Sequence, residues 1–345
     1  MAAVNEDLIQ KVFAEMVKYR PTLAKYLPDK DEGEETDLRI IADLVIKNFP
    51  WPVGVEVRRL FSGSMRQLGR MRLDQIFKTI ERTIQFVSFV MVCQVWYDIT
   101  NKKVNLPDHV KKEFADRFTL LTMGNFCWLI RALATAYTDQ KIEWFLPEMN
   151  EQFDKKFFAA LDFWVPERNE IGHYQINLDE GEIEKRCVEY DEKLIMILQR
   201  ISFFAKYRLV SVRDIKVIKP RIHEAKFHHI VDLLNSSDSD FKGEEIDEAK
   251  FSDSQSVLLM KSIKSFDDYL NLSPLIIDTN SEIIDAKEKF DIRKDIFMYT
   301  KYRNDHLMYL GTEVTEKCDL RSLSNYGILL EEFKSLMLAI GGVEV

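Results

Sequence analysis

Apolar residues recur at helical spacing along most of the chain before residue 206. Apolar positions three or four residues apart are typical of α-helices, and the alternation of a β-strand is scarce in this part of the sequence. The pattern predicts helices over residues 38–49, 73–99, from 108 onward, 123–138, 151–164 and 183–204. Asp179, three residues before Glu182, predicts the N-cap of the last helix, whereas residues 50–54 (PWPVG) predict a turn. We therefore expect a helical bundle over residues 37–205.

Residues 1–36 differ from the bundle in composition. They begin with a short amphipathic stretch that carries Leu8, Val12, Phe13, Met16 and Val17. The charged tract PDKDEGEETD follows, which is typical of a linker. The sequence therefore predicts an N-terminal helical arm and a charged linker before the bundle.

The pattern changes near residue 206. Residues 206–220 alternate as a strand does and end at Pro220, and residues 235–254 are rich in serine and acidic residues, which predicts a mobile loop. Short apolar runs then predict a small antiparallel sheet, and residues 325–340 predict a final helix that Gly341 and Gly342 terminate. The expected fold class is mainly α: a helical bundle followed by a smaller α+β domain over residues 206–345.

The composition is that of a globular protein, with 46% apolar residues, 12 Gly and 9 Pro. Four cysteines lie far apart without a CxxC pair, which is typical of reduced thiols in a cytosolic protein. The first residues, MAAVNEDLIQ, lack the basic and apolar segments of a secretory signal. The most apolar run, residues 86–97, is too short to span a bilayer. We therefore expect a cytoplasmic protein with no membrane partner.

Charge is unevenly distributed along this acidic chain, whose net charge is −9. An acidic balance argues against a protein that coats nucleic acid non-specifically, because such coating needs an excess of Lys and Arg. Between Glu56 and Arg82, however, seven basic residues stand against three acidic ones. This basic stripe suits a limited anionic ligand, although a solvated helix face would have the same composition. Its candidate binding residues are Arg58, Arg59, Arg66, Arg70 and Arg72.

The stretch VPERNEIGHYQIN, residues 165–177, carries the most specific candidate chemistry. Pro166 suits the first position of a short helix, because its missing N–H costs nothing there. On such a helix Asn169 and His173 share a face, and Arg168 projects to one side. The positive end of the helix would then favour an anion nearby. A histidine that exchanges protons at neutral pH and an arginine that fits a phosphate are suitable parts for phosphodiester cleavage without a metal.

The motif RNEIGH, residues 168–173, resembles the signature of HEPN domains: an arginine, a polar residue and a histidine a few positions later. The resemblance covers residues 37–205 and implies a HEPN-like helical bundle. Many HEPN proteins are metal-independent RNA endonucleases in bacterial toxin–antitoxin or anti-phage systems, and they usually act as dimers. The resemblance therefore implies Arg168, Asn169 and His173 as catalytic residues and no cofactor. It implies single-stranded or looped RNA as substrate, guided by the basic stripe, and a homodimer or a heterodimer with another HEPN chain.

One position departs from the family pattern. HEPN toxins that a partner nucleotidyltransferase modifies carry a tyrosine two residues after the histidine, whereas Tyr174 follows His173 directly here. Control by adenylylation is therefore not implied for this chain. The C-terminal domain is expected to sense a trigger or to dock a regulatory protein.

Alternatives to this interpretation remain open. The motif could be structural, with Arg168 capping or bridging the bundle, in a non-catalytic module that binds a nucleotide or a partner protein. His223, His228 and His229 are more typical of surface or strand histidines than of a metal site, because no Cys or carboxylate stands at a recognised ligand spacing. Residues 303–306, RNDH, predict a hairpin turn. Exposure separates the catalytic reading from the structural one, since a catalytic Arg168 and His173 must open onto a groove, whereas a structural pair would be buried and bonded within one chain.

Overall fold

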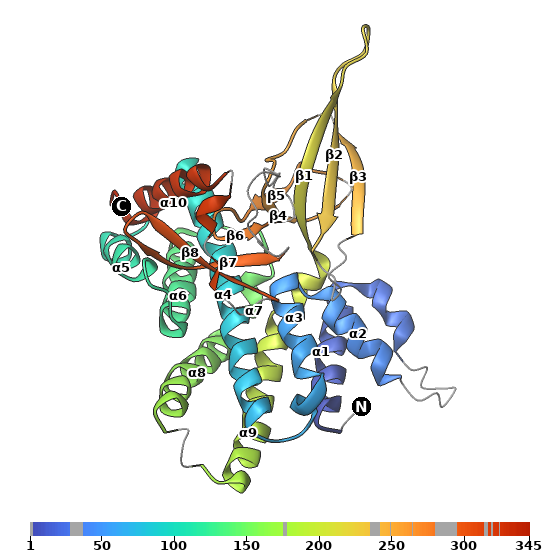
Figure 1. Cartoon of the computed structure of the whole chain (residues 1–345), viewed down its shortest axis with the longest axis vertical. Helices are drawn as coiled ribbons and strands as arrows, with labels where there is room; N and C mark the ends of the chain where they lie inside the picture. Colours follow the sequence, from blue (N-terminus) through green and yellow to red (C-terminus); the bar gives the residue numbers. More distant parts are fainter. Residues whose placement is uncertain are drawn as a thin grey trace. The chain divides into compact units, whose positions relative to one another are not determined.

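The structure is a computed structural model in which the chain is mainly α, with a smaller α+β part that carries antiparallel sheets (Figure 1). The described residues are 3–27, 37–174, 178–234, 242–248, 250–263, 265–279, 295–313, 317–318, 320–323 and 325–345, with backbone alone described at 3, 169–174, 242–243, 317–318 and 322. The predicted charged linker lies almost wholly outside these residues.

The chain divides into two compact units. The first consists of Met1–Phe86, Leu146–Tyr207 and Asn235–Ser239, and the second of Val87–Phe145, Arg208–Leu234 and Asp240–Val345. Residues 87–145 thus group with the C-terminal strands, whereas the sequence placed them in one bundle spanning residues 37–205. Helix α4 (Arg70–Thr100) belongs to the first unit up to Phe86 and to the second from Val87. Its apolar surface is nearly continuous, so the periodicity of the sequence does not reveal this boundary.

The first unit is helical, and most of its helices follow the predicted periodicity. Its helices are α1 (Glu6–Tyr19), α2 (Leu38–Asn48), α3 (Trp51–Leu60), the first part of α4 (Arg70–Thr100), α7 (Met149–Gln152), α8 (Lys155–Tyr174) and α9 (Glu180–Arg200), with 3-10 turns at Ala3–Asn5, Pro21–Tyr26, Gly63–Arg66 and Ser202–Lys206. Of the predicted N-terminal arm, Leu8, Val12 and Phe13 are buried. Helix α1 therefore packs into the core of its unit.

Helix α3 corrects the prediction of a turn at residues 50–54. Pro52 occupies the second position of the helix, where a missing N–H removes no intrahelical bond. A side chain at Gly54 would bring a Cβ atom within 2.6 Å of the Ile46 carbonyl oxygen, so only glycine allows the backbones of α2 and α3 to approach this closely. Proline and glycine are typical of turns, but here Pro52 lies at the start of a helix and Gly54 lies where two helices approach closely.

Helix α9 begins where the sequence predicted it. The Asp179 carboxylate accepts a hydrogen bond from the backbone N–H of Glu182 at 2.8 Å, which satisfies one of the free donors at the helix start. The buried face of the helix carries Ile183, Cys187 and Leu194, three of the predicted apolar positions. The N-cap prediction is therefore confirmed.

We expect Asp179→Ala to lower the free energy of unfolding by about 1 kcal/mol, because the cap hydrogen bond is lost while nothing apolar is exposed. Asp179→Asn, which keeps an acceptor oxygen, should retain most of the stability. Urea unfolding followed by helical circular dichroism measures both. Equal midpoints for the alanine variant and the wild type would show that the cap contributes nothing.

The second unit combines helices with two antiparallel sheets. Its helices are the second part of α4, α5 (Asp108–Phe118), α6 (Met123–Gln140) and α10 (Tyr326–Gly341). The strands are β1 (Arg208–Ile218), β2 (Lys226–Leu233), β3 (Lys242–Glu248), β4 (Val257–Met260), β5 (Tyr269–Asn271), β6 (Ile276–Asp278), β7 (Ile296–Arg303), β8 (His306–Gly311) and β9 (Lys317–Cys318). The strand orders are β3-β2-β1-β4-β5 and β6-β7-β8-β9.

Two local predictions in this unit are confirmed. Residues 303–306 form the β7–β8 hairpin turn, in which Asn304 and Asp305 adopt φ of 51° and 54°; a two-residue hairpin loop favours such left-handed residues. Helix α10 ends at Gly341, and Gly342 follows in the left-handed region with φ of 67°. Both elements follow from turn chemistry that is local in the sequence.

Strand β3 corrects the predicted mobile loop over residues 235–254. Residues 242–248 pair antiparallel with Phe227–Leu233 of β2 along their whole length. The acidic composition suggested a loop, but backbone hydrogen bonds to a neighbouring strand make this segment regular. Residues 235–241 and 249 lie outside the described part of the chain.

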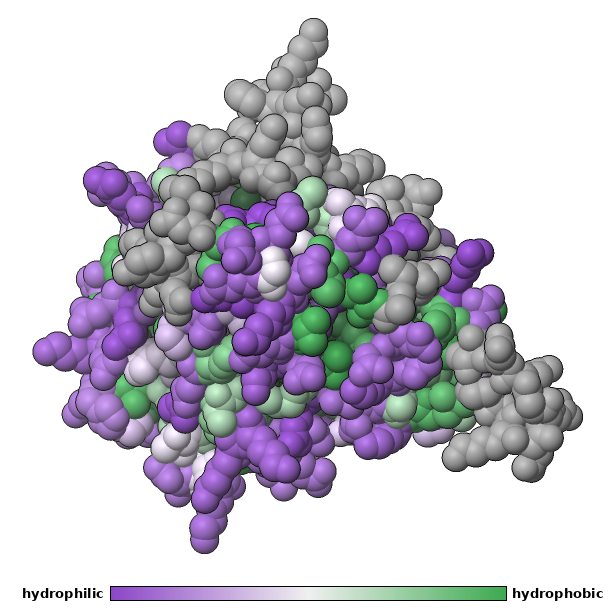
Figure 2. Space-filling view, turned by 90° about the horizontal axis from the view of Figure 1, so that it is seen from below, coloured by the Kyte–Doolittle hydropathy of each residue, from purple (hydrophilic) through white to green (hydrophobic). Residues whose placement is uncertain are grey.

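One face of the molecule illustrates how polar and apolar residues are distributed over the surface. On the face that Figure 2 shows, hydrophilic residues cover most of the area, and hydrophobic residues form smaller areas between them. Among the helices in the described ranges, none is both long enough and apolar enough to cross a membrane.

Candidate functional site

The predicted motif lies in the last turns of helix α8, and it does not lie at a helix start. Lys155 begins this helix, and the Asp154 carboxylate caps it by accepting from the backbone N–H groups of Lys156 and Phe157, each at 2.9 Å. The prediction that Pro166 opens a helix is therefore wrong, because Pro166 lies inside α8. The backbone N–H groups around the motif are within the helix, so the positive end of a helix dipole does not assist anion binding there.

Arg168 is the motif residue whose side chain the structure describes. Its side chain is 47% exposed, and its Nε lies 4.0 Å from Oε2 of Glu81 on α4, which is itself 40% exposed. Such a pair between exposed side chains contributes only about 0–1 kcal/mol. Asn169 and His173 follow on the helical backbone of α8, but their side chains lie outside the described residues. Arg168 is thus open to solvent.

An aromatic cluster holds the helix just before the motif. Trp164 is fully buried, and its ring lies edge-on to Phe77 of α4 and Tyr190 of α9, with centroids 5.6 Å apart in both cases. The Tyr190 hydroxyl donates to the Glu167 carboxylate. Burial, together with this hydrogen bond, raises the pKa of Tyr190, so it remains a neutral donor. These contacts hold α8 against α4 and α9.

Arg72 does not have the position that an RNA-binding residue needs. It is completely buried, and its guanidinium donates to both carboxylate oxygens of Asp191 on α9, at 2.9 and 2.6 Å. Its third nitrogen donates to the Asn5 side chain at 2.9 Å and to the Met65 carbonyl at 2.7 Å. Burial raises the pKa of Asp191, and the Arg72 guanidinium opposes that shift. Arg72 therefore joins α4, α9 and the 3-10 turn before α1, and it does not belong to an exposed basic surface.

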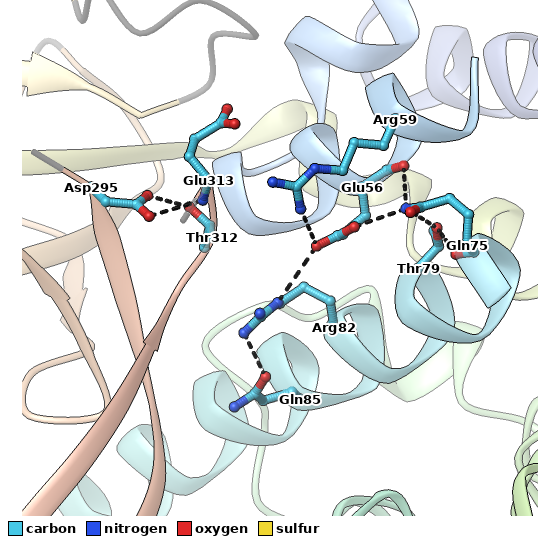
Figure 3. Close-up of polar contacts among 9 residues, drawn as sticks. All are labelled: Glu56, Arg59, Gln75, Thr79, Arg82, Gln85, Asp295, Thr312 and Glu313. Carbon is cyan, nitrogen blue, oxygen red and sulfur yellow. Dashed lines mark hydrogen bonds and ion pairs between the residues drawn. The ribbon is translucent and has the colours of Figure 1, made fainter. Parts of the chain in front are cut away.

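Other members of the basic stripe also pair within the unit. The Arg59 guanidinium donates to the Glu56 carboxylate at 2.9 Å, and that carboxylate also accepts from the Gln75 amide at 2.8 Å (Figure 3). Arg82 approaches Glu56 within 4.0 Å. Arg70 lies 3.5 Å from Asp74. The Arg59–Glu56 pair lies within α3 and the Arg70–Asp74 pair within α4, whereas Arg82 and Gln75 of α4 reach Glu56 of α3.

The other two candidate arginines of the stripe differ in exposure. Arg66 is exposed, and Arg58 is half-buried. Together they are a smaller cationic surface than the sequence suggested. Of the acidic partners, Asp191 is far from Arg72 in the chain and only the fold brings it there, whereas Glu56 and Asp74 stand three and four residues from Arg59 and Arg70, which is the spacing of helical ion pairs.

Two histidines outside the motif, His228 and His229, bond within the second unit. His229 is fully buried, and its Nε2 accepts from the backbone N–H of Ser252 at 3.1 Å. His228 pairs through Nδ1 with Asp247 at 2.6 Å, across the β2–β3 ladder. His223 is exposed near the β1–β2 turn. Within the described ranges, no group of three or more His, Cys, Asp or Glu side chains is arranged to hold a metal ion.

A cavity of about 550 Å³ lies in the second unit, between the end of α4, strand β5 and helix α10. Asp253, Asp267 and Glu332 line it, beside the aromatic rings of Trp96 and Tyr269. Burial raises the pKa of Glu332, and the nearby Asp253 charge acts in the same direction, although a hydrogen bond from Ser273 opposes it. A phosphate group would be repelled by these carboxylates, so the cavity does not suit a nucleotide. Its lining residues are spread from Cys93 to Glu332, and no sequence motif could have identified them.

The comparisons with known proteins add no further assignment. Neither a family model, nor a curated protein, nor a solved structure matches this chain. The interpretation of the site therefore rests on the residues and on their geometry.

Proposed function

We propose that this chain is a metal-independent RNA endonuclease of the HEPN type, with Arg168, Asn169 and His173 as its site. The observation that carries the proposal is the exposure of Arg168. A structural arginine in a bundle is buried and paired, as Arg72 is, whereas the only ion pair of Arg168 with a described side chain is a long one at the surface. A cation that contributes so little to stability can turn toward an anionic substrate at small cost.

The proposed reaction is attack of the 2′-hydroxyl on the adjacent phosphorus. The bond from the 2′-oxygen to phosphorus forms as the bond to the 5′-oxygen breaks, which leaves a 2′,3′-cyclic phosphate. His173 takes the proton from the 2′-hydroxyl or returns one to the leaving 5′-oxygen, because an imidazole exchanges protons near neutral pH. Arg168 stabilises the negative charge on the phosphate oxygens. Asn169 orients the side chain of either Arg168 or His173 by hydrogen bonding.

The biological setting is part of the same proposal. One arginine and one histidine are few for phosphodiester cleavage, so two chains would bring their motifs together in a homodimer or in a heterodimer with another HEPN chain. We place the enzyme in the cytoplasm, in toxin or anti-phage defence, with single-stranded or looped RNA as substrate. The region from residue 206 onward would receive the activating signal or bind a regulatory protein.

We expect the purified wild-type protein to cleave RNA in the presence of EDTA, because the proposed reaction uses only side chains. The products should carry 2′,3′-cyclic phosphates, or the 2′- or 3′-phosphates that their hydrolysis gives. Incubation with total RNA, followed by end-group analysis of the fragments, measures both. Cleavage that requires a divalent ion, or fragments with 5′-phosphates, would contradict the mechanism. RNA binding without any cleavage would favour a non-catalytic module.

A further inference from the structure

The cavity between the end of α4, strand β5 and helix α10 combines aromatic rings with carboxylates. All its lining residues belong to the second unit, and its volume of about 550 Å³ is within the range of about 300–1000 Å³ that small-molecule pockets occupy. Its aromatic side chains are Trp96 and Tyr97 of α4 and Tyr269 of β5, and Tyr97 is 56% exposed. The cavity therefore has the size and the ring surface to hold a small organic molecule.

The charged groups that line the cavity are all carboxylates. They belong to Asp253, Asp267 and Glu332, of which Glu332 is the most enclosed. The Glu332 carboxylate accepts a hydrogen bond from the Ser273 hydroxyl at 3.0 Å, and Asp253 accepts one from the Asn271 amide at 2.9 Å. These neutral donors orient the carboxylates without balancing their charge. Burial raises the pKa of Glu332, and the Asp253 charge acts in the same direction, which is the behaviour of a carboxylate with no cation beside it.

Among the described residues, no cation of the chain pairs with these carboxylates. Lys103 approaches the Tyr97 ring, with its Nζ 5.0 Å from the ring centroid, but its ion pair is with Asp98 at 3.6 Å, and Asp98 does not line the cavity. Lys261, which follows β4, pairs with Asp268 at 3.3 Å. Carboxylates and aromatic rings thus share a cavity that no described cation of the protein fills.

We propose that this cavity binds a small aliphatic diamine or polyamine. A primary ammonium group would donate to the carboxylates of Glu332 and Asp253 through charge-assisted hydrogen bonds, which are stronger than neutral ones. The rings of Trp96 and Tyr269 would attract the same charge through their π systems, and the methylene chain of the ligand would pack against them. Several carboxylates match more than one positive charge, which favours a diamine or a polyamine over a monoamine.

Other small ligands suit these groups less well. A phosphate would be repelled by the carboxylates, and a quaternary ammonium has no N–H group to donate to them. A metal ion would gain nothing from the rings, and within the described ranges no three His, Cys, Asp or Glu side chains are arranged to hold one. The proposal does not rest on cleavage at α8, and it gives the second unit a ligand of stated chemistry.

Isothermal titration calorimetry of the full chain with putrescine, in the absence of RNA, tests the proposal. The wild type should bind putrescine saturably. Glu332→Gln should weaken binding about tenfold or more, because it removes the charge that the ammonium meets and keeps an acceptor for the Ser273 hydroxyl. The matched control is Glu331→Gln, which removes an exposed carboxylate from the preceding position of α10, outside the cavity, and should bind as the wild type does.

The contribution of the rings is tested separately. Trp96→Leu should weaken putrescine binding about threefold or more, because a ring that attracts the ammonium is lost. Its control is Trp128→Leu, which removes another half-buried tryptophan of the second unit that does not line this cavity, and the affinity should be unchanged. Thermal melting followed by circular dichroism shows that each variant is folded.

Two analogues of putrescine separate charge from hydrogen bonding. 1,4-Butanediol is neutral and should not bind, whereas putrescine trimethylated at both nitrogens keeps its charges without N–H groups and should bind about tenfold more weakly. The proposal would be overturned by a wild type that does not bind putrescine, or by an affinity of Glu332→Gln equal to that of the wild type or of Glu331→Gln. Binding of the diol, tighter binding of the trimethylated compound or displacement of putrescine by an equal concentration of Mg²⁺ would also overturn it. Because no RNA is present, the outcome is independent of the proposed endonuclease.

Discussion

Arg168→Ala is expected to lower the rate of RNA cleavage by the purified protein at least a hundredfold. Removing one donor that stabilises charge in a transition state typically lowers the rate by about 100- to 1000-fold. The fold should be unaffected, because the ion pair to Glu81 is long and both side chains are substantially exposed. Arg168→Lys should restore only part of the activity, since an ammonium lacks the planar pair of donors that matches a phosphate.

The matched control for this substitution is Arg117→Ala. Arg117 is 42% exposed and pairs with Glu113 at 3.0 Å on α5, so the variant also removes a helical surface arginine with a carboxylate partner. Initial cleavage rates and the urea midpoint are measured for both variants beside the wild type. Unchanged cleavage by a folded Arg168→Ala protein would remove α8 as the site. Equal loss in both variants would indicate a general effect of surface charge.

Arg72→Ala is expected to destabilise the first unit by about 3–5 kcal/mol, because it leaves the buried Asp191 carboxylate without its cation. The guanidinium is fully buried, and it also satisfies the Asn5 side chain and the Met65 carbonyl, both of which lose a donor. The substitution further removes the volume of a large side chain from the core. The effect should exceed that of any single surface ion pair in the molecule.

Urea unfolding, monitored by helical circular dichroism, measures this effect. Lys11→Ala, which removes an exposed partner of Asp7, is the control and should change stability by less than about 1 kcal/mol. The double variant Arg72→Met, Asp191→Leu should recover much of the loss, because no charge is then left buried without a partner. If Arg72→Ala lowers the free energy of unfolding by less than about 1 kcal/mol, the buried Arg72–Asp191 ion pair does not hold α4 and α9 together as proposed.

Features that depend on neighbours in the chain could be predicted from the sequence. The helix over residues 73–99 follows from apolar spacing, the cap at Asp179 from a side chain that reaches Glu182, and the turn at residues 303–306 from residues that tolerate left-handed backbone. Each involves interactions within a few positions. The motif at residues 168–173 was likewise found in the sequence, and its activity remains a prediction.

Features that depend on distant partners were decided by the tertiary structure. Arg72 and Asp191 are 119 positions apart, so composition marked Arg72 as part of a basic surface although it is buried. The strand at residues 242–248 forms because β2 supplies backbone partners, and helix α8 continues through Pro166 with its neighbouring Trp164 packed against α4 and α9. Local propensities amount to about 1 kcal/mol per residue or less, apart from that of proline, whereas breaking a buried ion pair or truncating a packed aromatic ring costs about 3–5 kcal/mol. Packing therefore overrides the local pattern wherever the two disagree.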